Sequence, residues 1–362
     1  MHPPGRLTID LDALRDNWRR LARETAPSAC AAVVKANGYG LGVELAAAAL
    51  FKAGCRIFFV AHAGEGVRAR AALGREARIF VLNGFEAGAE VGDYAAAALA
   101  PVIGSAGELA RWDRSLPFAL HVDTGMNRLG FAPSELDPAK MGGAALLMSH
   151  FVSAENPDDP VNARQIAAFE RARALFPGVP ASLANSSGLF LPARPHYDLA
   201  RPGYALYGGN PTPGRENPMR AVATLEVAVQ QTRWIEPGET AGYNGRWTAR
   251  RRTKLATLLA GYADGLPFGA GATDAAPGPE VRIAGRMCPL VGRMSMDLCI
   301  ADVTYLPDSA VGPGTRAEFF GATAALDTFA AKSGTIGYQV LTGLGARYER
   351  IVRSGDPVSP DR

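Results

Sequence analysis

Lys35 stands at a position where a charged side chain is unexpected. In the stretch AVVKANGYG (residues 32–40) it follows apolar residues typical of a buried β-strand, where an ammonium group is costly to bury. Two interpretations are open: the side chain reaches solvent at the tip of the strand, or its amine serves chemistry in a pocket. A lysine in a dry pocket loses proton affinity and becomes a nucleophile toward carbonyl groups.

Further polar segments follow other apolar runs: DTGMNRLG (123–130), the histidine that ends MSH, ANSS (184–187) and RPG (201–203). Ser186 and the backbone amides of Gly203 and Tyr204 are suited to holding a phosphate. A nucleophilic lysine beside a phosphate site indicates pyridoxal phosphate held as a Schiff base. Taken alone, however, a lysine at the end of a strand is more often a surface residue with a buried stem.

The elements that would position these residues alternate along the chain. Residues 11–24 have the apolar spacing of an amphipathic helix, and residues 162–176 predict another helix. Short apolar strands are expected at 31–34, 56–61, 78–82, 117–122, 144–150 and 180–186. Strands alternating with helices indicate parallel βαβ units, in either a (β/α)8 barrel or an open doubly wound sheet.

The barrel is the favoured alternative for this α/β region. No GxGxxG sequence follows the first strand, as a dinucleotide-binding sheet would require. The carboxyl ends of barrel strands open onto one face, where active sites lie. The polar residues that follow the expected strands are Lys35, Asp123, His150, Asn185 and Arg201.

A second domain is expected after about residue 220, where the sequence becomes rich in strands and Gly/Pro turns. We therefore predict a (β/α)8 TIM barrel over residues 1–220, followed by an all-β domain over residues 221–362. The Gly- and Pro-rich segment 208–218 lies near this boundary.

Composition narrows the possible partners. The net charge is only +3 over 362 residues, with 48% hydrophobic and 20% charged residues, so nucleic-acid binding is not expected. The four cysteines lie too far apart in sequence for a zinc knuckle, and no metal is expected. The N-terminal MHPPGRLTID shows no signal-peptide pattern, and no apolar run is long enough to cross a membrane. We expect a cytoplasmic protein.

Five segments resemble motifs of the alanine racemase family, which consists of fold-type III pyridoxal-phosphate enzymes. They occur in the family's order and are spread over most of the chain: VVKANGYGLG, DTGMNRLG, RPGYALYG, GYADG and VGRMSMD. The resemblance implies a TIM barrel with a β domain, bound pyridoxal phosphate, an amino-acid substrate and a homodimer with shared active sites. The implied reaction is the interconversion of L- and D-alanine.

The resemblance also implies roles for individual residues. Lys35 matches the lysine that binds the cofactor and acts as the base for the D-enantiomer. Tyr262 matches the base for the L-enantiomer and would come from the partner subunit. Arg201 matches the arginine that faces the pyridine nitrogen, and His150 the histidine that supports it. The other implied cofactor contacts are Tyr39, Asn185, Ser186, Gly203 and Tyr204.

The substrate carboxylate would meet Arg128 and the backbone N–H of Met296, with Asp297 at the rim of the pocket. Two positions depart from the family pattern: at Ala346 some members carry a phosphate-binding tyrosine, and the other departure is at residue 121. Many members carry a lysine, often carbamylated, two residues before the DTGM sequence, and this lysine orients the arginine; here the residue is His121. A neutral histidine cannot supply the negative charge of a carbamate, so Arg128 must be held differently.

Other functions remain as alternatives. The chain could racemise serine, basic amino acids or a broader set of substrates. A non-catalytic pyridoxal-phosphate-binding barrel is disfavoured because such proteins typically lack a second domain with residues such as Tyr262. A fold-related decarboxylase is disfavoured because its family uses an acidic partner for the ring nitrogen. Whether D-alanine is made for peptidoglycan or degraded is left open.

Overall fold

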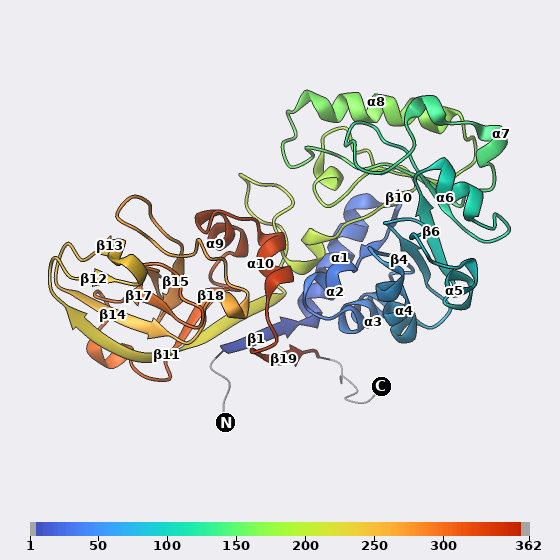
Figure 1. Cartoon of the computed structure of the whole chain (residues 1–362). Coiled ribbons are helices and arrows are strands. Elements are labelled where there is room, and N and C mark those ends of the chain that lie inside the picture. The colour runs from blue at the N-terminus through green and yellow to red at the C-terminus, as the bar shows by residue number, and fades with distance from the viewer. Residues whose placement is uncertain (1–4, 356–362) are drawn as a thin grey trace. The chain divides into compact units, whose positions relative to one another are not determined.

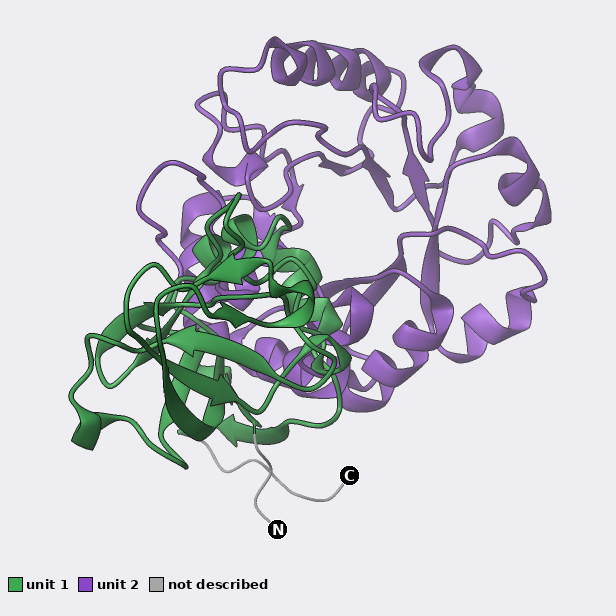
Figure 2. Ribbon diagram, turned by 60° about the vertical axis from the view of Figure 1, so that its left-hand side comes forward, with its two compact units in different colours: residues 1–13, 220–362 green, residues 14–219 purple. Residues whose placement is uncertain are grey.

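The computed structural model describes residues 5–355 in two compact units. We call them the barrel unit (residues 14–219; unit 2 in Figure 2) and the strand unit (residues 1–13 and 220–362; unit 1). This division differs from the expected 1–220 and 221–362 at the N-terminus, since the described residues 5–13 group with the strand unit. Residues 1–4 of the segment inspected for a signal peptide lie outside the described residues.

The barrel unit alternates strands and helices as expected (Figure 1). Its elements are α1 (Leu11–Thr25), β2 (Ala29–Cys30), β3 (Ala32–Val33), α2 (Lys35–Tyr39), α3 (Val43–Ala53), β4 (Ile57–Val60), α4 (Ala63–Leu73), β5 (Arg78–Val81), α5 (Val91–Ala96), β6 (Leu99–Ile103), α6 (Ala106–Arg111), β7 (Ala119–His121), η1 (Pro133–Glu135), α7 (Pro138–Met141), β8 (Leu146–Met148), α8 (Pro160–Ala174), β9 (Ala181–Ser182), η2 (Gly188–Phe190), β10 (Leu199–Ala200) and η3 (Tyr204–Tyr207).

Strands β3 to β9 form a parallel sheet in chain order, and backbone hydrogen bonds close it into a barrel. On one side of β10, the Arg201 amide donates to the Ala184 carbonyl over 2.9 Å. On the other side, β10 pairs in parallel with β2, and the Val33 amide donates to the Pro202 carbonyl over 3.0 Å. Counting β2 and β3 as one interrupted strand, eight parallel strands surround the core, and Figure 2 shows the helices outside this ring. The expected barrel is confirmed.

The core of the barrel follows from its apolar strands. β4 and β6 are buried at every residue, as in a parallel sheet covered on both faces. Helix α1 packs through the apolar stripe read from the sequence, with Leu14 and Leu21 at 1% and 0% exposure. Helix α8 begins two residues before the expected position because Asp159 caps it and Pro160 occupies its first turn.

The strand unit is mostly β-structure, as expected, with two short helices that the sequence analysis did not predict. Its elements are β1 (Gly5–Asp10), β11 (Ala223–Ile235), β12 (Thr240–Ala241), η4 (Tyr243–Gly245), β13 (Trp247–Thr248), β14 (Thr253–Leu258), η5 (Tyr262–Asp264), β15 (Glu280–Ile283), β16 (Arg286–Pro289), β17 (Cys299–Asp302), η6 (Asp308–Ala310), β18 (Arg316–Phe320), α9 (Leu326–Lys332), α10 (Gly337–Gly343) and β19 (Glu349–Arg353).

Strand β1 explains why the N-terminus groups with this unit. It lies between β11, with which it pairs antiparallel, and β19, with which it pairs in parallel. The residues of β1 from Arg6 to Asp10 alternate between polar and apolar side chains, and Leu7 and Ile9 are almost fully buried. The long strand β11 pairs with β14 from Val229 to Ile235, with a bulge between Val229 and Gln231.

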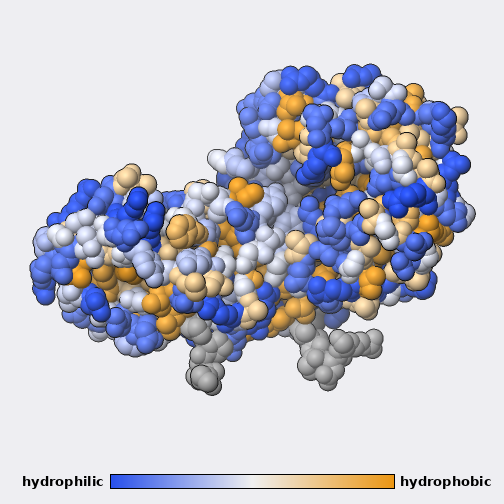
Figure 3. Space-filling model, viewed as in Figure 1, coloured by the Kyte–Doolittle hydropathy of each residue, from blue (hydrophilic) through white to orange (hydrophobic). Residues whose placement is uncertain are grey.

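No helix among the described residues is long and apolar enough to cross a membrane. On the face drawn in Figure 3, hydrophilic and hydrophobic residues are interspersed over the surface.

Candidate active site

The backbone after β3 makes an unusual turn that carries Lys35. Ala36, Asn37, Gly38 and Tyr39 all adopt positive φ angles, between 52° and 61°, so the segment assigned as α2 is a left-handed turn. Left-handed backbone is unfavourable for residues other than glycine, and it persists where the surroundings impose it.

Two side chains of α4 and a backbone amide of α3 hold that turn. The Glu65 carboxylate accepts from the backbone N–H groups of Asn37, over 3.1 Å, and Ala61, over 2.9 Å. The Asn37 side-chain oxygen in turn accepts from the Val43 N–H (3.2 Å) and from Arg68 (2.9 Å). These contacts fix the backbone direction immediately after Lys35.

The Lys35 amine is half-buried beside other cationic or basic groups. Burial, and next the positive charge of Arg128, lower the pKa of Lys35 below its ordinary value, while Glu65 acts in the opposite sense. A lowered pKa increases the neutral, nucleophilic fraction of the amine at neutral pH. This setting favours the pocket interpretation of Lys35 over the surface interpretation.

Arg201 is a buried cation, and no carboxylate among the described residues accepts a hydrogen bond from it. It is 3% exposed and donates to the Ser182 hydroxyl and, over 2.5 Å, to the Ser149 carbonyl. One terminal nitrogen also lies 3.5 Å from His150 Nδ1. Burial lowers the pKa of Arg201 to about 9, which leaves the guanidinium charged at neutral pH.

His150 is held neutral by this environment. Burial lowers its pKa well below the ordinary value, and the charges of Arg201, Lys35 and Arg128 act in the same direction. These interactions place His150, Lys35, Arg128 and Arg201 in one electrostatic cluster at the carboxyl ends of the barrel strands.

Tyr39, Ser186 and Gly203 meet beside the cluster. The Ser186 hydroxyl accepts from the amides of Gly203 (3.0 Å) and Ala205 (3.2 Å). The Tyr39 hydroxyl lies against Gly203 so closely that any side chain at this glycine would collide with it. The Tyr39 ring stacks on Tyr207 with centroids 4.5 Å apart. Tyr204 is buried at the start of η3, and Asn185 accepts from the Gly188 amide over 2.8 Å.

The remaining predicted residues lie in the strand unit, where Tyr262 opens η5. Its side chain is 40% exposed and forms an edge contact with Phe268, with ring centroids 5.8 Å apart. The Tyr262 amide donates to the Ser295 carbonyl over 3.1 Å, which brings Met296 and Asp297 beside the turn. The predicted site residues thus form two sets, one in each unit.

Comparisons with known proteins assign both units. The alanine racemase N-terminal domain family matches residues 9–211, and the alanine racemase C-terminal domain family matches residues 222–352. The chain belongs to the alanine racemase family. An alanine racemase from Methylobacterium nodulans is 52% identical, with 98% of each chain covered.

Solved alanine racemases share the fold. The enzyme from Bartonella henselae, whose structure holds covalently bound pyridoxal phosphate, is 37% identical with a TM-score of 0.89, and 97% of this chain and 99% of that chain are covered. A biosynthetic alanine racemase from Pseudomonas aeruginosa is 33% identical with the same TM-score, and the match covers 98% of this chain and all of that chain. The family and the fold expected from the five motifs are therefore confirmed.

The residues present fit the cofactor of this family. The fit rests on Lys35 with its lowered pKa, on the amides and hydroxyls that meet at Ser186 and Gly203, and on Arg201, a donor without an acidic partner among the described residues. Hydroxyl and amide donors suit a phosphate, and an amine suits an aldehyde. Within residues 5–355, no group of three or more His, Cys, Asp or Glu residues is arranged to hold a metal ion.

His121, one of the residues that depart from the alanine racemase pattern, is neutral. It is 8% exposed, and burial, followed by the charge of Arg201, lowers its pKa to about 4. Arg128 itself is exposed and makes no hydrogen bond or ion pair with any described residue. The loop that carries it is shaped instead by Asp123, whose carboxylate accepts from the amides of residues 125–127 over 2.8 to 2.9 Å.

Several residues of the site were missed by the sequence analysis. Ser149 and Ser182 bind Arg201, and Glu65 holds the turn after Lys35. The sequence assigned no functional role to any of these three residues. Asp264 lies within the GYADG motif and could have been found there. Arg347, described below, carried no sequence signal.

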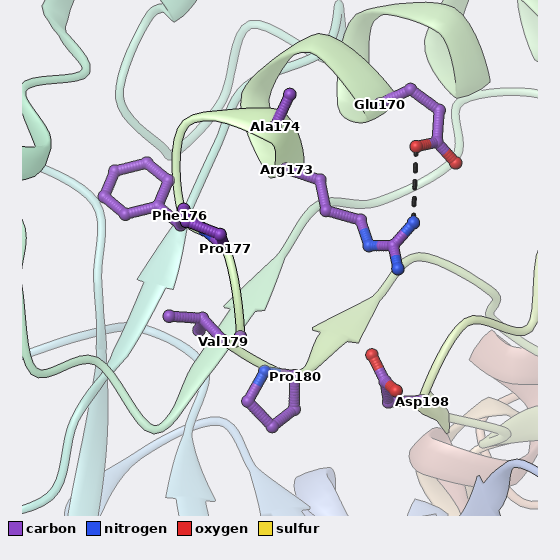
Figure 4. A pocket seen from close by; sticks show the side chains of 9 residues that line it. Glu170, Arg173, Ala174, Phe176, Pro177, Val179, Pro180 and Asp198 are labelled. Carbon is purple, nitrogen blue, oxygen red and sulfur yellow. Dashed lines mark hydrogen bonds and ion pairs between the residues drawn. The ribbon is translucent and has the colours of Figure 1, made fainter.

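A cavity of about 400 Å³ lies elsewhere in the barrel unit and contains none of the predicted site residues. Figure 4 shows its lining, including the pair of Glu170 and Arg173 and the side chain of Asp198. Pro180 and Asp198 precede β9 and β10, so the cavity lies at the amino ends of these strands, opposite the site.

Proposed function

We propose that this chain is a pyridoxal-phosphate-dependent alanine racemase that interconverts L- and D-alanine with one base on each face of the α-carbon. The observation that carries the proposal is the cluster of Lys35, His150 and Arg201, in which Arg201 has no carboxylate partner among the described residues. The family match over both units supports the same conclusion.

The barrel unit would hold the cofactor. When bound, pyridoxal phosphate supplies an electron sink that acidifies the α-proton of an amino acid. Lys35 is proposed as its covalent attachment, and Arg201 as the donor that faces its pyridine nitrogen, with His150 beside the ring. The proposed contacts of its phosphate and ring edge are Tyr39, Asn185, Ser186, and the amides of Gly203 and Tyr204.

Arg201 would determine which reaction is favoured. A guanidinium is a hydrogen-bond donor only, so it leaves the pyridine nitrogen unprotonated and weakens the electron sink. A weaker electron sink would favour return of a proton to the α-carbon, which is the outcome that racemisation needs. An acidic residue in this place would favour transamination or decarboxylation instead.

Two bases would move the proton. Lys35, with its pKa lowered by burial and by Arg128, is proposed to act on the face from which D-alanine loses its proton. Tyr262 of the partner subunit is proposed to act on the opposite face, for L-alanine. Arg128 and the N–H of Met296 would bind the substrate carboxylate, with Asp297 at the rim.

The proposed assembly is a homodimer in which each strand unit completes the partner's site. Large apolar side chains exposed on the strand unit support an interface there: Tyr262, Phe268, Met296 and Ile336. The proposed location is the cytoplasm, and the proposed role is to supply D-alanine for peptidoglycan. A D-alanine requirement after deletion of the gene would test that role, and growth without added D-alanine would contradict it.

The reaction is tested by following optical rotation and α-proton exchange in heavy water for purified holoenzyme, with alanine, serine, lysine and arginine as substrates. We expect alanine to react fastest. Faster reaction of serine or a basic amino acid would favour the alternative of different specificity, because His121 and the unheld Arg128 alter the carboxylate side of the pocket. If none of the four amino acids exchanged its α-proton, the proposal would be contradicted.

A further inference from the structure

Two loops of the strand unit that carry proposed active-site residues are tied together by their backbones. The amides of Tyr262 and Ala263 donate to the carbonyls of Ser295 and Met296, over 3.1 and 3.0 Å. The loops approach so closely at Gly261 that a side chain there would collide with both of these carbonyls. Any shift of one loop therefore displaces the other.

Asp264 ends the η5 turn and is buried, at 5% exposure. Its carboxylate accepts from the Gly261 amide over 2.9 Å, which closes the turn around Tyr262, and from Arg347 Nε over 2.6 Å. Its backbone carbonyl accepts from the Gly345 amide over 3.0 Å. The segment that carries Arg347, between α10 and β19, is thus held against the turn.

Arg347 also binds the second loop. Its Nη1 donates to the Asp297 carboxylate over 2.7 Å, so one guanidinium bridges two acidic residues, one on each loop. Hydrogen bonds to Asp297, and next to Asp264, raise the pKa of Arg347. The side chains of Arg347 and Asp297 are 50% and 55% exposed, and an ion pair at such exposure contributes little to stability. The Asp264 carboxylate is 7% exposed and also accepts from the Gly261 amide. The geometry of the bridge is therefore its distinctive property.

We propose that Arg347 is a positioning residue that sets the place of the Tyr262 phenol relative to Met296 and Asp297. This inference rests on the proposed function, in which Tyr262 is the base for L-alanine. A planar guanidinium donates in two fixed directions from Nε and Nη1, whereas a lysine ammonium is a point charge on a flexible stem. Arg347→Lys should therefore preserve the charge and lose the bridge.

The experiment compares Arg347→Met and Arg347→Lys with wild-type holoenzyme and with Arg252→Met as a matched control. Arg252 forms an exposed ion pair with Glu236, over 3.2 Å, in the same unit and touches neither loop. Three quantities are measured for each: racemisation of alanine, α-deuterium uptake into L- and D-alanine separately, and the visible absorbance of the bound cofactor together with the melting temperature.

If Arg347 positions Tyr262, racemisation and uptake into L-alanine both fall about 10- to 100-fold in Arg347→Met. Uptake into D-alanine stays within about twofold of wild type, because Lys35 can remove and return the proton on its own face. Arg347→Lys recovers less than half of the loss on a logarithmic scale. Racemisation by Arg252→Met equals that of wild type, and the cofactor absorbance and melting temperature of the variants are unchanged.

Two results would overturn the inference. One is racemisation by Arg347→Met within twofold of wild type. The other is an equal loss of uptake into both enantiomers, especially with reduced cofactor absorbance or melting temperature, which would indicate a general structural role. Failure of the wild-type enzyme to racemise alanine would instead contradict the proposed function, so the two failures are distinguishable.

Discussion

Arg201 and His121 show how neighbouring residues can be set to different charge states by one barrel. Arg201 keeps its charge because its pKa, lowered to about 9, remains above neutrality, and hydroxyl and carbonyl oxygens satisfy its donors. His121, on which the charge of Arg201 acts, is neutral because its pKa is about 4. The cluster therefore has a fixed positive charge at Arg201 and none at His121.

A pH prediction follows for His121. Its pKa is about 4 in the folded chain and 6.5 when unperturbed, so between these values only the unfolded chain takes up the proton. The contribution of neutral His121 to the free energy of unfolding is complete above pH 6.5 and is lost as the pH falls toward 4. The loss at pH 5 is about 2 kcal/mol.

The measurement is the fall in melting temperature between pH 7.5 and pH 5 for wild type and for His121→Gln. Wild type should fall further, by a few degrees more, because glutamine has no proton to bind. Equal falls in the two proteins would show that His121 is not held neutral by the fold.

At the scale of elements, the left-handed turn after Lys35 is the least ordinary piece of backbone in the site. Three residues other than glycine adopt positive φ angles in it, each at about 1–2 kcal/mol. Glu65 and Asn37 offset part of this strain with hydrogen bonds to the backbone of Asn37 and Val43. The turn is thereby fixed where Lys35 must meet the cofactor.

Gly38 and Gly74 provide a comparison that tests the turn. Both have positive φ, but Gly38 has ψ 46° in the left-handed helical region, whereas Gly74 has ψ −164°, a conformation that is essentially restricted to glycine, so Gly→Ala introduces more backbone strain at Gly74. An added Cβ at Gly38 would lie 3.2 Å from the Ala46 Cβ and 3.3 Å from the Val43 amide, whereas nothing lies within 4 Å at Gly74.

We expect Gly38→Ala to destabilise the fold by about 1 kcal/mol and Gly74→Ala by at least as much, but only Gly38→Ala to reduce cofactor retention. Retention is measured from the visible absorbance after gel filtration. Equal retention in the two variants would mean that the turn tolerates displacement and does not determine the position of Lys35.

The same elements show what the sequence could predict and what it could not. Strands that are buried on both faces leave an apolar run, so β4 and β6 were readable, as was the helical stripe of Leu14 and Leu21. The closure of the barrel by β10 was not, because two residues of strand carry too little pattern. The conformation of residues 36–39 depends on a contact with Glu65, which lies 28 residues from Asn37 in the sequence. The local sequence of residues 36–39 therefore does not predict it.

Among the candidate site residues, the sequence predicted Lys35, His150 and Arg201, and in the structure the charges of Lys35 and Arg201 both act on His150. Sequence could not identify Arg347, because its partner Asp264 is 83 residues away and the bridge exists only once the loops pack. Strand β1 was missed for a related reason: its alternation is short, and its partners β11 and β19 lie more than 200 residues further along the chain.

At the scale of the whole molecule, the predicted site residues are divided between two units, with Lys35 in one and Tyr262 in the other. The proposed homodimer makes each site from the barrel unit of one subunit and the strand unit of its partner. A shared site has a consequence that a site within one subunit does not: two inactive variants can restore activity when they form a hybrid dimer.

The prediction concerns Lys35→Ala and Tyr262→Phe. Each homodimer should be nearly inactive, but after the subunits are mixed, unfolded and refolded together with cofactor, a hybrid has one site with both bases. Random pairing should recover about a quarter of wild-type activity. Light scattering should report a dimer throughout. No recovery, in a mixture shown to contain hybrids, would place Lys35 and Tyr262 of each site in the same subunit.

The most direct test of the account is the exchange of the α-proton by Tyr262→Phe holoenzyme in heavy water. The account assigns Lys35 and Tyr262 to opposite faces of the substrate, so removing the phenol hydroxyl should affect one enantiomer only. We predict that deuterium uptake into L-alanine falls about 100-fold or more, while uptake into D-alanine stays close to wild type without inversion. Equal losses for both enantiomers, or unchanged racemisation, would contradict the two-base assignment.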